Sequence, residues 1–282
     1  STTPTHHGSP HPIFLFPSGP SQVLRLRPSS PIELCDGAGR VVPCTIAGVS
    51  RKHAEVIAAG PPRDVPWEGP KISVAVACAS LASGRADWMV EKATELGAWS
   101  ILPLETERST LRGSGAPPGS KGKKKSKTKT KTKEGDDVGC GEEVRDASDP
   151  EPASGLVGRE KRWRRLVVAA NQQSLRAHAT KIEPTVCIHD WVVGPGSGSL
   201  SGYDLVLLAA AGGAPLAEVL RRPVHRPALS DGGKVLVVVG PEGDFTPEEQ
   251  AELVAAGATL VGLGPLRLRV ETAVLAALAA LA

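Results

Sequence analysis

The sequence predicts an α/β protein with a parallel sheet in its larger part and a smaller β domain in front of it. From Ile72 onward, short apolar runs alternate with helical patterns, which is typical of βαβ units. Before residue 66 the apolar runs are short, and Pro and Gly separate them at the spacing of a small barrel. With 282 residues, the chain is long enough for two domains that each bury a core.

The β domain is expected over residues 13–66, followed by a proline-rich linker. Its apolar runs are Ile13–Phe16, Val23–Leu26, Ile32–Cys35, Val41–Val49 and Ala54–Ala58. Residues 1–12 are rich in Ser, Thr, Pro and His and contain no acidic residue, so we expect them to be disordered. Such a segment is also typical of a transit peptide, which predicts the plastid stroma or the mitochondrion. If the segment is not a targeting signal, the cytoplasm is expected.

The larger domain is expected over residues 71–282. Its predicted strands are Ile72–Ala79, Ser100–Leu104, Asp204–Ala210, Val235–Val239 and Thr259–Leu263. Between the first two strands, the apolar residues from Ala86 to Leu96 recur on one helical face, and those from Trp163 to Ala170 form a second such face. Strands that alternate with helices in this way predict a parallel sheet covered by helices.

A low-complexity insert interrupts this domain over residues 113–158. It begins rich in Gly and Pro, continues as a Lys/Thr run to Lys133, and becomes acidic from Glu134. Because it has almost no apolar residues, it cannot offset the entropy lost on ordering, and we expect it to be disordered. The lysines suit RNA phosphates, but a solvated expansion is the favoured interpretation, since the acidic half nearly cancels the basic half.

Two loops near the C-terminus predict a small-molecule site. The buried run Val235–Val239 leads into Gly240-Pro-Glu-Gly243, whose glycines can adopt positive φ and leave no side chain between the backbone and a ligand. Thr246–Glu249 forms a capping box, and Gly257 is expected to end that helix. A second loop follows the strand that ends at Leu263. Because both loops lie at carboxyl ends of strands, they mark the edge of a parallel sheet where ligands bind.

Several other classes of protein are excluded or disfavoured by the sequence. No Gly-Lys-Ser/Thr follows Gly240–Gly243, so the loop is not a P-loop, and the G-x-G-x-x-G spacing of dinucleotide sites is absent. The five cysteines are scattered and the seven histidines have no metal-ligand spacing, so we expect reduced thiols and no metal. No run reaches the roughly 18 apolar residues of a membrane span. The net charge of +3 does not by itself indicate a nucleic-acid binder.

Five motifs, in order along the chain, carry a family resemblance. They are Val23-Leu-Arg-Leu-Arg27 with Asp36-Gly37, Asp87–Gly97, Pro103–Ser109, Arg162–Ser174, and the pair Gly240–Gly243 with Leu263–Ala273. Together they resemble the RsmE family, the 16S ribosomal RNA (uracil-N3)-methyltransferases of the SPOUT superfamily, in its plant and algal form. The resemblance covers most of the chain apart from the insert and both extreme ends. Two positions depart from it: Asp244 replaces a glycine, and Leu266 stands where an arginine is expected.

The resemblance implies a fold, a cofactor and partners. It implies a SPOUT sheet with a C-terminal trefoil knot, a PUA-like N-terminal barrel, and a homodimer that acts on small-subunit ribosomal RNA or an assembling subunit. The implied cofactor is S-adenosyl-L-methionine. Its expected contacts are Leu208, Gly240, Pro241, Glu242, Gly243, Leu263, Gly264, Pro265, Leu268, Thr272 and Ala273. Alternatives are a SPOUT enzyme for another ribosomal or transfer RNA position, and a non-catalytic RNA-binding assembly factor.

Methylation at uracil N3 requires loss of the N3 proton, which leaves charge on O2 and O4. A cation beside those oxygens lowers the barrier, and Arg269 is the candidate, with Arg267 second. The alternative interpretation of Arg269 is an ordinary surface arginine that covers the edge of the sheet. Glu271 is a candidate base, but an acidic residue in the first helical turn also interacts favourably with the helix dipole. Glu242 either orients the ligand or caps its turn.

The candidate RNA contacts are polar and basic residues in or near these motifs, of kinds that usually lie at the protein surface. Arginine suits phosphate through its planar fork, and a glutamine–serine pair at a helix end is able to reach a base. The alternative for each is an ordinary surface position. The candidates are Arg25, Arg27, Arg108, Gln173, Ser174 and Arg176.

Overall fold

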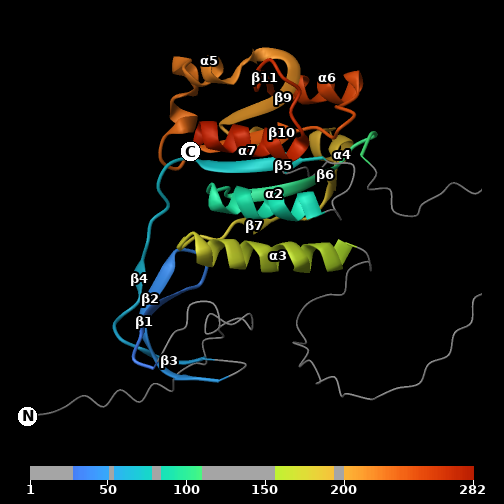
Figure 1. Ribbon diagram of the computed structural model, residues 1–282. Coiled ribbons are helices and arrows are strands. Elements are labelled where there is room, and N and C mark those ends of the chain that lie inside the picture. Colours follow the sequence, from blue (N-terminus) through green and yellow to red (C-terminus); the bar gives the residue numbers. More distant parts are fainter. Residues whose placement is uncertain (1–27, 51–53, 78–83, 110–155, 194–199) are drawn as a thin grey trace, which may run out of the picture.

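The computed structural model describes residues 28–50, 54–77, 84–109, 156–193 and 200–282, and it contains two sheets (Figure 1). The first sheet is antiparallel and consists of β1 (Pro31–Cys35), β2 (Arg40–Val49), β3 (Ala54–Ala58) and the short β4 (Arg63–Asp64). Val41, Cys44 and Ile46 on β2 are buried. The predicted runs Ile13–Phe16 and Val23–Leu26 lie outside the described residues.

The second sheet is parallel throughout its described ladders, as the sequence predicts. Its strand order is β11-β9-β10-β5-β6-β7, and β8 also pairs with β6. The strands are β5 (Lys71–Val76), β6 (Ser100–Glu105), β7 (Lys181–Ile182), β8 (Val186–Cys187), β9 (Leu205–Pro215), β10 (Lys234–Val239) and β11 (Thr259–Gly262). The predicted strand Asp204–Ala210 is thus too short, because β9 continues through Gly212 and Gly213 to pair with the end of β11.

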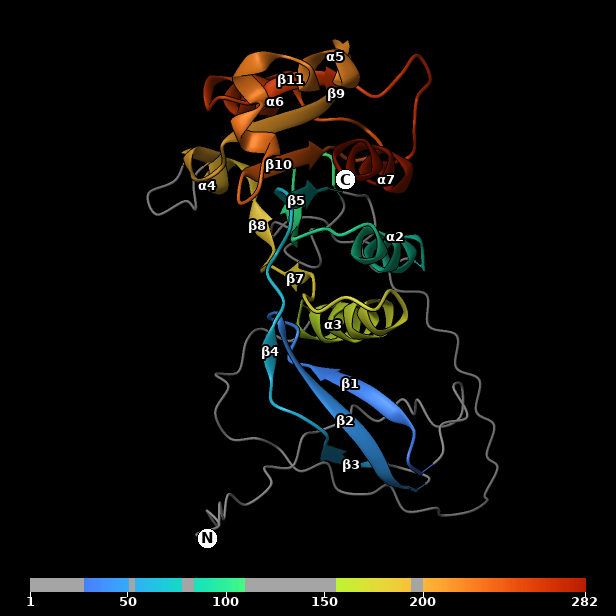
Figure 2. The same cartoon turned by 90° about the vertical axis from the view of Figure 1, so that its left-hand side faces the viewer.

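Helices cover both faces of this sheet (Figure 2). The helices are α2 (Gly84–Glu95), α3 (Leu156–Gln173), α4 (Ile188–Val193), α5 (Leu216–Leu220), α6 (Pro247–Ala255) and α7 (Val270–Leu281). Short 3₁₀ turns lie at Leu200–Gly202, Pro223–His225 and Pro227–Leu229. On one face α2 lies between α3 and α7, and on the other α4 packs against α6. Because α3 begins at Leu156, the last residues of the predicted insert 113–158 are helical.

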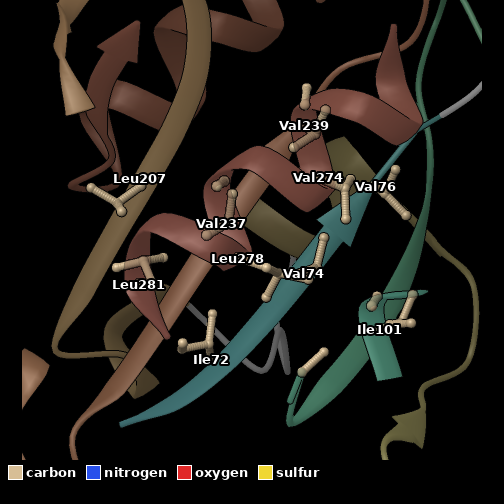
Figure 3. Close-up of a cluster of buried hydrophobic side chains, with 14 of the residues drawn as sticks. Ile72, Val74, Val76, Ile101, Leu207, Val237, Val239, Val274, Leu278 and Leu281 are labelled. Carbon is tan, nitrogen blue, oxygen red and sulfur yellow. The ribbon is translucent and has the colours of Figure 1, made fainter. Parts of the chain in front are cut away.

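The alternation of side chains along each strand creates two cores. Ile72, Val74 and Val76 point toward α7, where they meet Val237, Val239, Val274 and Leu278 (Figure 3). Leu236 and Val238 point to the other side, toward Phe245 and Leu253. Burial on both faces explains why these strands are continuous apolar runs. Each fully buried Val or Leu contributes about 1.5–3 kcal/mol, so the sheet is a rigid base for the loops that leave it.

The predicted caps of α6 are confirmed. The Thr246 hydroxyl accepts a hydrogen bond from the Glu249 amide at 3.2 Å, and the Glu249 carboxylate accepts one from the Thr246 amide at 2.9 Å. Pro247 occupies the first turn. Gly257 has φ of 102° just beyond the helix, a conformation that glycine adopts without strain. Glu271 lies in the first turn of α7, as expected.

Candidate active site

A cavity of about 960 Å³ opens at the carboxyl ends of β9, β10 and β11. Its walls are residues 209–213 of β9, the loops after β10 and β11, and the first turn of α7. These three strands are neighbours in the sheet. The lining residues are 209–213, 239–244, 262–270 and Ala273. This is the edge of the sheet at which the sequence predicts a ligand.

The first loop, residues 240–244, is a tight turn in which the positive φ lies at Asp244 and not at a glycine. The Asp244 amide donates to the Pro241 carbonyl at 2.8 Å, and Asp244 itself has φ of 64°. Gly240 and Gly243, which can adopt positive φ, do not have it in this turn. These glycines provide space instead: a Cβ at Gly240 would lie 3.0 Å from the Phe245 ring.

Two arginines from other loops hold this turn in place. Arg108, which follows β6, donates from Nη1 to the carbonyls of Gly243 at 2.9 Å and Phe245 at 3.3 Å. Arg267, in the loop after β11, donates from Nη2 to the Glu242 carbonyl at 2.7 Å. Hydrogen bonds from a charged donor are stronger than neutral ones. The turn is therefore fixed from both sides through its backbone.

The buried carboxylate of Glu249 connects the same turn to the loop after β6. One oxygen accepts from the Thr246 amide, and the other accepts from the Glu107 amide at 2.8 Å. In that loop, Ser109 Oγ accepts from the Thr106 amide at 2.8 Å. The capping residue of α6 thus fixes the segment that brings Arg108 to the cavity.

The other two walls depend on close approach of backbone to backbone. A Cβ at Gly213 would lie 2.5 Å from the carbonyl carbon of Val261, closer than real Cβ contacts. Gly264 has φ of 125° and begins the turn after β11. Beyond it, Leu266 is 77% exposed at the rim of the cavity. Small residues and backbone, not large side chains, therefore shape this part of the site.

Most of the predicted cofactor contacts line the cavity, and two do not. Leu208 is completely buried in the sheet, where it pairs with Val238 and Leu260, and Thr272 is exposed on α7. The remaining nine predicted residues are in the lining. The wall formed by residues 209–213 was not among the predicted contacts. The signal for this wall was Gly212-Gly213-Ala214-Pro215 directly after an apolar run.

The two catalytic candidates differ in position. Arg269 lines the cavity, is exposed, and sits at the N-cap position of α7 without a capping hydrogen bond from its side chain. Glu271 is absent from the lining and lies half-buried in the first turn of α7. Its position there fits the alternative role at the positive end of the helix.

The RNA candidates separate into two groups. Arg108 contacts the first loop of the cavity through the Gly243 carbonyl, without lining the cavity itself. Gln173, Ser174 and Arg176 lie near the amino ends of the strands, where α3 leads into β7. Ser174 donates its hydroxyl to the Ala170 carbonyl at 2.7 Å. Arg25 and Arg27 lie outside the described residues. In a single copy of the chain, the cavity and the end of α3 are therefore at opposite edges of the sheet.

The side chains that line the cavity limit the kinds of reaction that it can support. Its ionisable lining groups are Glu242, Asp244, Arg267 and Arg269. In the described ranges, no cluster of three or more His, Cys, Asp or Glu is arranged for a metal, and no helix is long and apolar enough to cross a membrane. A site made of backbone, small residues and a few charges suits group transfer by positioning and electrostatics.

Comparison with known proteins gives the class of this site. Residues 68–133 and 152–282 match a family model described as an RNA methyltransferase domain. The chain is 30% identical over 269 residues to ribosomal RNA small subunit methyltransferase E of Mycobacterium tuberculosis (strain CDC 1551 / Oshkosh), covering 92% of this chain and 80% of that protein. The chain therefore belongs to the ribosomal RNA small subunit methyltransferase E family.

Two further similarities concern the family and the fold, respectively. A protein of the same name from Bacillus subtilis (strain 168) is 25% identical over 263 residues, covering 92% of this chain and 84% of the relative. A crystal structure of such an enzyme from Neisseria gonorrhoeae, bound to S-adenosyl methionine, superposes with a TM-score of 0.65 at 24% identity. It covers 92% of this chain and 85% of that one, and it supports the fold.

Proposed function

We propose that the protein transfers a methyl group from S-adenosyl-L-methionine to N3 of a uridine in small-subunit ribosomal RNA. The observation that carries the proposal is the cavity at the ends of β9, β10 and β11, formed by the loops that hold the family motifs. Family membership and the relatives named for small-subunit ribosomal RNA support the substrate class. The N3 position follows from the family resemblance.

The cavity has the size and lining that this cofactor needs. Ala209, Leu263, Leu268 and Ala273 offer apolar surface for a flat base, and the turns around them present backbone groups. The carboxylates of Glu242 and Asp244 suit the cationic parts of the cofactor. These residues would hold it, with Arg108 and Arg267 keeping the first turn in shape.

Bound in the cavity, the cofactor supplies an electrophilic methyl group on a positively charged sulfur. The N3–CH₃ bond forms as the S–CH₃ bond breaks, and a neutral thioether leaves. Arg269 stabilises the negative charge that spreads over O2 and O4 when N3 loses its proton. A lining carboxylate accepts that proton, and Asp244 is the less exposed of the two. Most of the rate enhancement then comes from holding the base in line with the methyl group.

The proposal also includes three features that the family resemblance implies: a C-terminal trefoil knot, a PUA-like N-terminal barrel and a homodimer. The trefoil knot of the last loops follows from the family resemblance, and the antiparallel sheet β1–β4 supports a PUA-like barrel over residues 13–66. The exposed Leu266 at the cavity rim supports a homodimer, since a second copy would cover it. Light scattering of the purified chain tests the dimer: a mass of one chain at micromolar concentration contradicts it.

Two measurements test the function. Calorimetric titration with S-adenosyl-L-methionine is expected to give one site per chain, and absence of binding excludes the enzyme in favour of a non-catalytic RNA-binding factor. Nucleoside digests of small-subunit RNA from cells with and without the gene are expected to differ in N3-methyluridine. Unchanged N3-methyluridine together with another lost modification identifies the alternative, a methyltransferase for a different position.

A further inference from the structure

A second cavity, of about 410 Å³, lies at the opposite edge of the sheet from the proposed cofactor site. It is formed where the linker after β4 meets the start of β5, the end of α2 and the turn after α3. Its aromatic and ionisable lining residues are Trp67, Glu68, Arg176 and His178, with Ile72 and Leu96 as apolar walls. None of these residues takes part in the proposed methyl transfer.

Aromatic and cationic side chains gather around this cavity. Trp67 meets Trp99 edge to face with ring centroids 4.9 Å apart. The ammonium groups of Lys71 and Lys181 each lie 4.5 Å from the Trp99 ring, and the guanidinium carbon of Arg176 lies 5.3 Å from the Trp67 ring. Of these residues, only Trp67 and Arg176 line the cavity. An aromatic ring beside a cation is the pairing with which proteins bind single-stranded nucleic acid, because aromatic faces stack on bases and cations contact phosphates.

The Arg176 side chain lacks a hydrogen-bond acceptor among the described residues. Its Nε is fully buried without a partner, and its guanidinium lies over the face of Trp67. Burial lowers the pKa of the guanidinium, which reflects the cost of removing it from water. The rest of the guanidinium can donate to acceptor oxygens of a ligand in the cavity that Arg176 lines.

The surrounding structure holds Arg176 in this position. Asn171 donates from Nδ2 to the Arg176 carbonyl at 2.7 Å, and the Arg176 amide donates to the Asn171 carbonyl at 3.1 Å. Between them, Leu175 has φ of 56°, which is unfavourable for a bulky residue. Gly97 leaves space for the guanidinium, because a Cβ there would lie 2.5 Å from Arg176 Nη1.

Trp67 is fixed in a similar way. Its indole N–H donates to the Pro70 carbonyl at 3.3 Å, and its ring contacts the edge of His178 at a centroid distance of 5.3 Å. His178 in turn donates from Nε2 to the Val65 carbonyl at 2.8 Å. A carbonyl only accepts, so Nε2 carries the proton. The aromatic wall and the cation are thus both held in place before any ligand arrives.

We propose that this cavity binds one unstacked nucleotide of the RNA substrate, with its base against Trp67 and its phosphate on the Arg176 guanidinium. A planar guanidinium matches phosphate oxygens in pairs and also stacks on a flat ring. The inference rests on the proposed function only in taking RNA as the ligand. It assigns the junction between the two sheets a role as a second RNA contact, separate from the methyl-transfer cavity.

The test measures binding of fluorescein-labelled decauridylate to the full chain by anisotropy at several salt concentrations. Arg176→Gln and Trp67→Leu are each expected to weaken binding about tenfold, since one stacked base contributes about 1–3 kcal/mol. Arg176→Gln should also lower the slope of log affinity against log salt by about 0.7, the value for one phosphate contact on a single strand. Arg176→Lys should keep the slope but lose part of the affinity.

Arg222→Gln is the matched control, because it removes the same charge from an exposed arginine near Glu218, beyond α5. It is expected to change affinity less than twofold. Wild-type affinity and slope in Arg176→Gln overturn the proposal and leave the cluster as packing between the two sheets. Equal competition by millimolar inorganic phosphate and by uridine monophosphate also overturns it in favour of a simple anion pocket.

Thermal melting of each variant shows whether a loss of RNA affinity comes from a folding defect. Trp67→Phe, which keeps an aromatic ring, is expected to retain most of the affinity for decauridylate. Calorimetry with S-adenosyl-L-methionine distinguishes this inference from the proposed function. Unchanged cofactor affinity in Arg176→Gln is expected if the two cavities are separate. If the wild-type chain binds decauridylate through Arg176 but binds no cofactor, the proposed function fails and the RNA site stands.

Discussion

The two edges of the parallel sheet use arginine in opposite ways. At the carboxyl edge, Arg108 and Arg267 donate to backbone carbonyls of one turn and so serve as internal supports. At the amino edge, Arg176 lies against Trp67 with no acceptor in the described chain. The difference suggests a rule for interpreting arginines. An arginine whose N–H groups donate to acceptors of its own chain has a structural role, whereas one without such acceptors is available to bind a ligand.

The largest expected effect concerns the backbone walls of the carboxyl edge. Gly213→Ala places a methyl group against the Val261 backbone and should lower the free energy of unfolding by about 3 kcal/mol, because packed backbone cannot yield. Gly202→Ala is the control, since nothing lies within 4 Å of the point that a Cβ would occupy there. Denaturant titration measures both. Equal stability of the two variants would mean that this wall adapts to side chains.

The next effect separates binding from chemistry within the same cavity. Arg269→Ala should lower turnover by about 10², the scale of losing one electrostatic donor, while cofactor affinity stays within about twofold. Single-turnover methylation and calorimetry measure the two quantities. A large loss of cofactor binding instead would assign Arg269 to the cofactor and not to the uracil oxygens.

A smaller effect is expected from the buried capping carboxylate. Glu249→Ala leaves the amides of Thr246 and Glu107 without their acceptor and should cost about 2 kcal/mol of stability. Glu248→Ala, at an exposed neighbouring position, should lower the stability by only a few tenths of the amount expected for Glu249→Ala. Thermal melting compares them. Similar melting temperatures would show that Glu107 and the α6 cap are independent.

The smallest effect tests the supporting role of arginine directly. Arg267→Ala removes one hydrogen bond to the Glu242 carbonyl and should weaken cofactor binding about fivefold, which corresponds to about 1 kcal/mol. Turnover at saturating cofactor should change little. A drop in turnover as large as that of Arg269→Ala would place Arg267 beside the reacting base.

The sequence predicted the parallel sheet well because its strands are unbroken apolar runs such as Val235–Val239, and it predicted the α6 cap because Thr246 and Glu249 act locally. It failed where distant segments decide the geometry. Gly212 and Gly213 suggest a loop, yet they extend β9 because β11 passes beside them. The positive φ falls on Asp244, whose amide closes the turn by donating to the Pro241 carbonyl.

The sheet order has a consequence for synthesis on the ribosome. Central strand β5 pairs with β6 soon after both emerge, but its other neighbour, β10, begins only at Lys234. At about 5–20 residues per second, the open edge of β5 waits roughly 10–30 s for its partner. During that interval an apolar strand displays unpaired backbone groups, which favours aggregation. A nascent chain of this protein therefore exposes that edge of β5 until β10 has been synthesised.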